Sequence, residues 1–257
     1  MDAIRCLLND RPALIEAPPG LAALAWLRER REWTGTREGC NEGECGACAV
    51  LLGEPGPGGP RYRAVASCLL PVGELAGRHL VTIEGLNPPA GLNPIQQALV
   101  DEGAPQCGFC FSGFVVSLTG FFLTSKDLSV ADACAAIDGN ICRCTGYASV
   151  RRAITRLCDD FGSRLDSSRP RLEQLVAWGV LPGHFRDAAA RLVALAVPAG
   201  STAAGPLTGG ATDLLVQRRA DLIPGPLAFV SRRSDLRGIE RDLDALVIGG
   251  GVTISEL

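Results

Sequence analysis

The sequence predicts an α+β protein of several domains: a small sheet domain, then an all-helical domain, then a short α/β segment. Three observations predict this order. Short strand-like runs surround a single amphipathic helix in the first 85 residues, apolar helical patterns dominate residues 92–162, and a Gly-Gly turn follows a strand-like run after residue 201. A chain of 257 residues also exceeds what one hydrophobic core usually supports.

The first 85 residues alternate short apolar runs with turn residues. The predicted elements are strands at 3–8 and 13–17, a helix at 21–30, and strands at 49–52, 61–68 and 79–84. The helix has apolar residues at positions 21, 24 and 27, which share one face. The turn Asn9-Asp-Arg-Pro12 separates the first two strands, and the Gly/Pro-rich stretch 53–60 forms a hairpin loop. This order of elements is that of a β-grasp domain, placed at residues 1–85.

A glycine-rich loop between the helix and the third strand carries three cysteines, and a fourth follows at the end of the fourth strand. The four are Cys40, Cys45, Cys48 and Cys68. Their Cys-x4-Cys-x2-Cys…Cys spacing is the plant-type ferredoxin pattern for a 2Fe–2S cluster. Glycines at 39, 43 and 46 allow positive φ angles and let backbone N–H groups turn toward sulfur. The alternative is a four-cysteine zinc site, but zinc sites favour two separated Cys-x2-Cys pairs.

Residues 92–162 are predicted to form the helical domain, after a linker at 85–92. The predicted helices run from Pro94 to about 102, from Phe111 to about 125, from a capping-box-like Ser129-Val-Ala-Asp132, and through a last helix to Phe161. The segment after Phe111 is apolar on all sides, so we expect it to be buried.

A second cysteine set lies in this helical domain. It comprises Cys107, Cys110, Cys142 and Cys144. Both pairs fall at or just before predicted helix starts, where unpaired N–H groups and the positive end of the helix dipole stabilise an anionic cluster. A zinc site with Cys-x2-Cys and Cys-x-Cys pairs is again the alternative. The other cysteines, Cys6, Cys134 and Cys158, are expected to be small buried hydrophobic residues.

Composition and charge limit the classes of partner and the cellular compartment that the sequence predicts. The net charge of −3 predicts neither a nucleic-acid surface nor one for anionic membranes. No apolar run approaches the ~20 residues of a membrane span, and no signal peptide is recognisable, so we expect a cytoplasmic protein. Eleven cysteines with close spacings then favour metal binding over disulfides.

Both cysteine sets, in this order, resemble the iron–sulfur module of the xanthine dehydrogenase family of molybdenum hydroxylases over residues 3–161. The motifs that carry the resemblance are Gly39-Cys40-x4-Cys45-Gly-x-Cys48, Gln106-Cys107-Gly-Phe-Cys110 and Gly139-Asn-Ile-Cys142-Arg-Cys144-Thr-Gly-Tyr147. The resemblance implies that the first set binds an outer cluster and the second the cluster nearer molybdenum. It also implies that Gln106 hydrogen-bonds the molybdopterin cofactor and that Cys144 approaches the pterin.

Residues 163–200 are predicted to form an ordered connector with short helices at 172–178 and 185–195, and a new domain is predicted at 201–257. The Gly-Gly turn near 209, with the run Ala245–Leu257, resembles the start of the family's FAD-binding domain of the PCMH type. The resemblance implies a flavin pyrophosphate contact by Leu207, Thr208, Gly209, Gly210, Ala211, Thr212, Asp213 and Leu214. In the family that domain continues for well over a hundred further residues. We therefore expect one of three explanations: another chain supplies the remainder, the gene product is shortened, or the sequence ends early.

The sequence therefore predicts the iron–sulfur and partly flavin-binding electron-transfer subunit of a molybdenum hydroxylase, of the xanthine dehydrogenase type first. Electrons would pass from a molybdopterin site on a large partner subunit, which also carries the catalytic residues, through two 2Fe–2S clusters to FAD and NAD. A hetero-oligomer is expected. Alternatives are a hydroxylase of aldehydes, carbon monoxide or other heteroaromatic compounds, a stand-alone 2Fe–2S carrier, and a zinc-bound structural or assembly protein.

Overall fold

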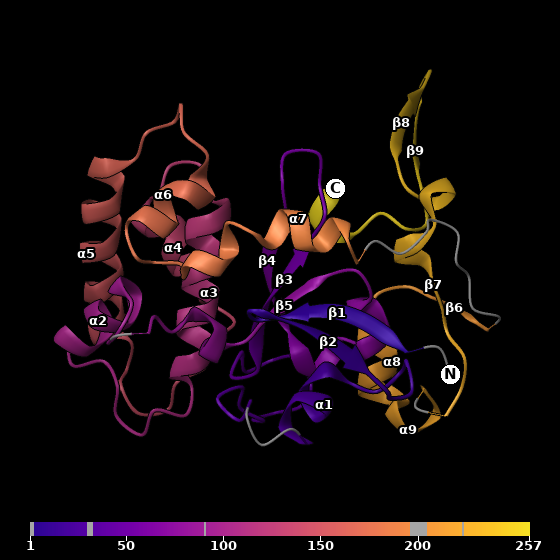
Figure 1. The fold of residues 1–257 in the computed structure, drawn as a ribbon, viewed down its shortest axis with the longest axis horizontal. Helices are drawn as coiled ribbons and strands as arrows, with labels where there is room; N and C mark the ends of the chain where they lie inside the picture. Colours follow the sequence, from indigo (N-terminus) through magenta and orange to yellow (C-terminus); the bar gives the residue numbers. More distant parts are fainter. Residues whose placement is uncertain (1–2, 30–32, 90, 196–204, 223) are drawn as a thin grey trace.

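The computed structural model describes residues 3–29, 33–89, 91–195, 205–222 and 224–257. A sheet domain lies at the centre, a group of helices on one side and the C-terminal segment on the other (Figure 1). Predictions for residue 30 of the first helix, residue 90 of the linker, residues 196–200 of the connector and residues 201–204 and 223 of the last domain lie outside the described residues.

The central sheet has five strands in the order β2-β1-β5-β3-β4. Its elements are β1 (Ile4–Leu8), β2 (Arg11–Ile15), α1 (Ala23–Glu29), β3 (Ala49–Glu54), β4 (Arg61–Ala66) and β5 (His79–Val81). β1 and β5 are parallel, and the other neighbouring strands are antiparallel. This sequence of elements is the one that the apolar pattern predicts, with α1 burying Leu24 and Leu27 as its spacing requires.

Two boundaries of the sheet differ from prediction. The first turn uses only Asn9 and Asp10, because Asn9 adopts a left-handed φ of 53° that closes the turn early. Pro12 therefore lies within β2, which is tolerated because β2 is an edge strand and needs no further N–H donor there. The last strand is shorter than predicted, ending at Val81, and a 3-10 turn over Ile83–Leu86 follows it.

The fourth strand also ends early, at Ala66, so Cys68 lies on a 3-10 turn over Ser67–Leu69 rather than on the strand. The Ser67 hydroxyl and backbone N–H both donate to the Cys48 carbonyl, at 2.7 and 3.2 Å. These bonds continue the pairing of β4 with β3 by one residue beyond Ala66 and hold the fourth cysteine beside the third.

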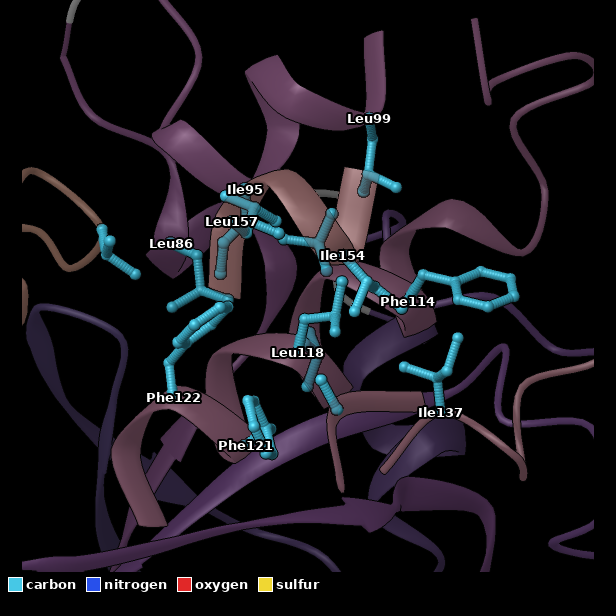
Figure 2. Packing of buried hydrophobic residues seen from close by; sticks show 14 of the residues in the cluster. Leu86, Ile95, Leu99, Phe114, Leu118, Phe121, Phe122, Ile137, Ile154 and Leu157 are labelled. Carbon is cyan, nitrogen blue, oxygen red and sulfur yellow. The ribbon is translucent and has the colours of Figure 1, made fainter. Parts of the chain in front are cut away.

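The helical domain comprises α2 (Pro94–Asp101), α3 (Phe111–Thr124), α4 (Val130–Ala135) and α5 (Ala148–Arg164). The predicted starts of α2 and α4 are capped: Asn93 forms a capping box with Gln96, and the Ser129 hydroxyl accepts from Asp132 N. Figure 2 shows the core that these helices share, in which Phe114 and Leu118 of α3 face Ile154 and Leu157 of α5. α3 is buried along most of its length, as predicted.

The connector packs on both preceding domains. Its helix α6 (Arg171–Ala177) adds Leu175 to the helical core, and Trp178 stacks on Phe161 of α5 with ring centroids 5.2 Å apart. Helix α7 (Ala188–Val193) lies along β1 (Figure 1), where Ala188 and Leu192 bury Leu7. The connector therefore fixes the helical domain against the sheet.

The C-terminal segment lies against the sheet domain at the end away from the helices (Figure 1). It contains β6 (Leu207–Thr208) parallel to β7 (Ala228–Phe229), helices α8 (Thr212–Gln217) and α9 (Arg219–Leu222), and a projecting hairpin of β8 (Ile239–Asp242) and β9 (Ala245–Ile248). Phe229 packs so closely on Gly73 that a Cβ there would lie 2.2 Å from its ring. Within the described ranges, no helix has both the length and the apolarity to cross a membrane.

Candidate metal centres

The first cysteine set is gathered by the loop between α1 and β3 together with the turn after β4. Three backbone N–H groups donate to its sulfurs: Cys40 N to Cys45 Sγ at 3.3 Å, and Glu42 N and Glu44 N to Cys40 Sγ at 3.4 and 3.3 Å. Gly43 and Gly46 have positive φ angles of 82° and 66°, as the turning of the loop around sulfur predicts. The loop thus presents N–H donors to sites of negative charge.

The thiols of this set are paired. Cys40 is hydrogen-bonded to Cys45, and Cys48 to Cys68. The bond from Cys68 lowers the pKa of Cys48 to about 6, while the same bond, burial and the charge on Cys48 raise the pKa of Cys68. Cys48 and Cys68 are buried, whereas Cys40 and Cys45 are partly exposed. One pair therefore lies inside the domain and the other at its surface.

The second set has the same two-pair arrangement. Cys107 and Cys144 lie with their sulfurs 3.8 Å apart at the surface, and Cys110 and Cys142 are buried and hydrogen-bonded. Burial and the contact with Cys142 raise the pKa of Cys110 to about 12. For Cys142, burial opposes ionisation, but donation from the Thr145 hydroxyl and neighbouring N–H groups leaves its pKa lowered.

The cysteines of the second set that are neighbours in sequence, Cys107 with Cys110 and Cys142 with Cys144, precede helix starts, as predicted. Cys110 is the residue before α3, and Cys144 lies four residues before α5. Tyr147 shapes the second loop: it has a φ of 66°, and its hydroxyl accepts from Cys142 N at 2.8 Å and donates to the Asn140 carbonyl at 3.4 Å. Gln106 is exposed, directly before Cys107.

The two cysteine loops contact each other across the domain boundary. Ile141 N donates to the Cys45 carbonyl at 3.0 Å, and the Asn140 side chain donates to the Gly46 carbonyl at 3.1 Å. Gly113 of α3 meets the same carbonyl, since a Cβ there would lie 2.2 Å from it. Each residue in these two hydrogen bonds is therefore a cysteine of one of the two sets or lies within two positions of such a cysteine.

The residues expected to bind FAD lie on β6 and the start of α8, and Ala211 and Leu214 share an apolar cluster with Leu69, the residue after Cys68. Leu207 is exposed, Thr208 is buried, and a Cβ on Gly209 would meet no atom within 4 Å. Ala211 precedes α8 with a φ of 58°. Space is open at Gly209, and α8 is a short helix of 6 residues.

Sequence reasoning missed Asn140, Tyr147 in its loop-shaping role, and Arg219, whose guanidinium contacts the first loop. Polar residues between the cysteines hinted at the first two, but Arg219 carries no local signal. Among the described residues, no three Cys, His, Asp or Glu side chains form a ready site for a metal ion. The sulfurs of Cys107 and Cys144 lie 3.8 Å apart, and Cys48 and Cys68 share one buried cluster.

A sheet domain with a cysteine loop, joined to a helical domain with a second cysteine set, is the architecture of an iron–sulfur protein. Residues 82–155 match the family described as a 2Fe-2S binding domain. The alpha subunit of isoquinoline 1-oxidoreductase from Brevundimonas diminuta is 37% identical over 60% of this chain and 95% of its own length. A nicotinate dehydrogenase subunit from Pseudomonas putida is 32% identical over 59% of this chain and 92% of its own length.

Among solved structures, quinoline 2-oxidoreductase from Pseudomonas putida 86 superimposes with a TM-score of 0.54 at 31% identity, covering 63% of this chain and 96% of that one. The chain belongs to the xanthine dehydrogenase/aldehyde oxidase family of molybdenum hydroxylases, among its iron–sulfur subunits. Relatives named aldehyde oxidase or xanthine dehydrogenase are much longer, and the chain spans 10–12% of their length.

Proposed function

We propose that this chain holds two 2Fe–2S clusters, one in each cysteine set, and carries electrons from a molybdopterin site on a larger partner subunit. The ligands are Cys40, Cys45, Cys48 and Cys68 for the first and Cys107, Cys110, Cys142 and Cys144 for the second. Bound clusters of this type supply one-electron transfer, at potentials set by charge, hydrogen bonds to sulfur and burial. The observation that carries the proposal is the hydrogen-bonded contact between the two loops, through Ile141 and Asn140.

The pairing of the thiols supports two irons per set over one zinc ion. In a 2Fe–2S cluster each iron takes two of the four cysteines, so the ligands divide into two pairs. A structural zinc ion instead needs all four sulfurs around one point. The first pattern is supported by the Cys40 N–H bond to Cys45 Sγ, by the shared buried cluster of Cys48 and Cys68, and by the 3.8 Å contact between the sulfurs of Cys107 and Cys144.

The proposed reaction of the complete enzyme is hydroxylation of a nitrogen heteroaromatic ring by water. An enzyme of the xanthine dehydrogenase type is the first candidate. The relatives covered almost completely are named for isoquinoline and nicotinate, and the solved structure for quinoline, all of which are such rings. Other relatives are named aldehyde oxidase, so an aldehyde is the second candidate substrate.

Gln106 is the proposed contact to the molybdopterin cofactor. It is exposed beside Cys107 and Cys144, the surface pair of the second set, which is therefore the end available to a partner protein. Gln106→Ala is expected to slow electron transfer from the cofactor, or weaken its docking, with both clusters still assembled. Full transfer rates in this variant, measured by stopped-flow reduction of the complex, would remove the assigned role.

Binding of FAD by residues 207–214, and passage of electrons to NAD, are proposed on the resemblance and on the open turn at Gly209. Flavin released from the purified complex, and its loss on replacing Gly209 and Gly210 by valine, would support this. A complex that holds both clusters and no flavin would instead assign electron delivery to an external acceptor.

The test of the central proposal is metal analysis with absorption spectroscopy on the purified chain and on the complex. About four irons per chain, for two 2Fe–2S clusters, and visible absorption that bleaches with dithionite are expected. A colourless protein that contains zinc after anaerobic purification would contradict the proposal and leave a structural role.

A further inference from the structure

Arg219 joins the C-terminal segment to the first cysteine loop. Its Nη2 donates to the Asn41 carbonyl at 2.7 Å and to the Cys68 carbonyl at 3.4 Å, and its Nε donates to the Leu215 carbonyl at 3.1 Å. The guanidinium therefore connects α8 with the residue after Cys40 and with Cys68 itself. Asn41 has a left-handed φ of 61°, and Cys68 lies on the 3-10 turn over Ser67–Leu69, so Arg219 bonds to two turns.

Apolar packing holds this contact in place. Leu69, which follows Cys68, packs both with the C-terminal residues Leu215 and Phe229 and with the core around Cys48. Leu222 also approaches the turn before α1 so closely that a Cβ on Gly20 would lie 2.2 Å from its carbonyl oxygen. The segment thus covers the first set with a fixed surface and brings Arg219 to it.

Within the part of the chain that the structure describes, Arg219 takes part in no salt bridge, whereas its neighbour Arg218 pairs with Asp221 at 3.0 Å. The guanidinium is partly buried, so water screens it less than a surface charge. A partly desolvated positive charge therefore lies beside two carbonyls of the first set.

We infer that Arg219 is a positioning residue that raises the reduction potential of the first cluster and links that potential to docking of the C-terminal segment; this rests on the function proposed above. Reduction adds one electron to the cluster, breaks no bond and makes its net charge more negative by one unit. A nearby positive charge stabilises the reduced state over the oxidised one. Loss of the charge should therefore make the first cluster harder to reduce.

The test is a potentiometric titration of the complex, followed by EPR so that the two clusters are measured separately. Arg219→Met is expected to lower the midpoint potential of the first cluster and leave that of the second unchanged. Arg219→Lys, which keeps the charge but not the forked geometry, should recover part of the shift. Arg218→Met removes an exposed arginine one residue away and should change neither potential.

The sign of the shift separates this role from simple docking. If Arg219 only held the segment down, its loss would admit water, and water favours the more highly charged reduced state, which raises the potential. An unchanged or raised potential in Arg219→Met, with full iron content, would overturn the inference. Absence of any 2Fe–2S signal in the wild-type complex would instead contradict the proposed function.

Discussion

Gly113 of α3 is the position at which added volume should do most damage between the two cysteine loops. In Gly113→Ala the new Cβ would lie 2.2 Å from the Gly46 carbonyl oxygen and 2.9 Å from Asn140 Nδ2. That carbonyl is already held by donation from Asn140 and from Ala49 N, so it cannot swing aside without losing hydrogen bonds. Overpacking of this kind costs about 1–3 kcal/mol, and we place it in the upper half of that range because the obstacle is backbone.

Alanine also favours the helix by about 1 kcal/mol over glycine, so a net loss of about 1–2 kcal/mol of unfolding free energy is expected for Gly113→Ala. The matched control is Gly162→Ala in α5, where a Cβ would meet nothing within 4 Å and the helix should gain about 0.5–1 kcal/mol. Urea unfolding followed by circular dichroism measures both variants. Equal or greater stability of Gly113→Ala than of Gly162→Ala would refute the close backbone approach.

Two further predictions concern buried polar groups. Burial lowers the pKa of His79 to about 4, and its ring lies between the Tyr62 hydroxyl and the Asn9 carbonyl, so the folded state holds it neutral. Since the pKa of His79 in the unfolded chain is near 6.5, its contribution to the free energy of unfolding should be fully present above pH 6.5 and fall by up to about 3 kcal/mol toward pH 4. Urea unfolding midpoints measured across that range should show this fall, and a flat profile would contradict it. Tyr147→Phe removes the acceptor for Cys142 N, at a cost of about 1–3 kcal/mol to that loop; faster loss of iron from the second set to a chelator is expected, and wild-type retention would count against the role of the hydroxyl.

Much of the fold followed from local pattern. Apolar spacing predicted α1, the buried α3 and the order of strands, because each of these buries a face that its own sequence defines. The predicted ends of strands were wrong where contacts with residues distant in sequence determine them. The fourth strand ends at Ala66, where the 3-10 turn over Ser67–Leu69 begins. Ser67 still bonds to Cys48, nineteen residues away, and no neighbouring residue signals that bond.

The candidate site was predictable in its ligands and not in its surroundings. The spacing of the cysteines alone predicts the ligands, because a cluster requires short sequence intervals between the cysteines of each loop. The contacts of Arg219 with Asn41 and of Asn140 with Gly46 join residues 178 and 94 positions apart. Such contacts depend on how whole domains dock, so the local sequence does not show which residues will meet, even at Asn140, where a polar residue near the cysteines hints at a role.

Two glycines and two backbone carbonyls shape the junction between the two cysteine loops. Gly46 and Gly113 each lack the Cβ that would collide there, and the hydrogen bonds across the junction are accepted by the carbonyls of Cys45 and Gly46. Because glycine lets two backbones approach more closely than any side chain allows, the loops lie nearer than packed side chains would permit. A short and fixed separation suits the proposed electron transfer, and it accounts for glycine at position 113, which lies outside the cysteine motifs.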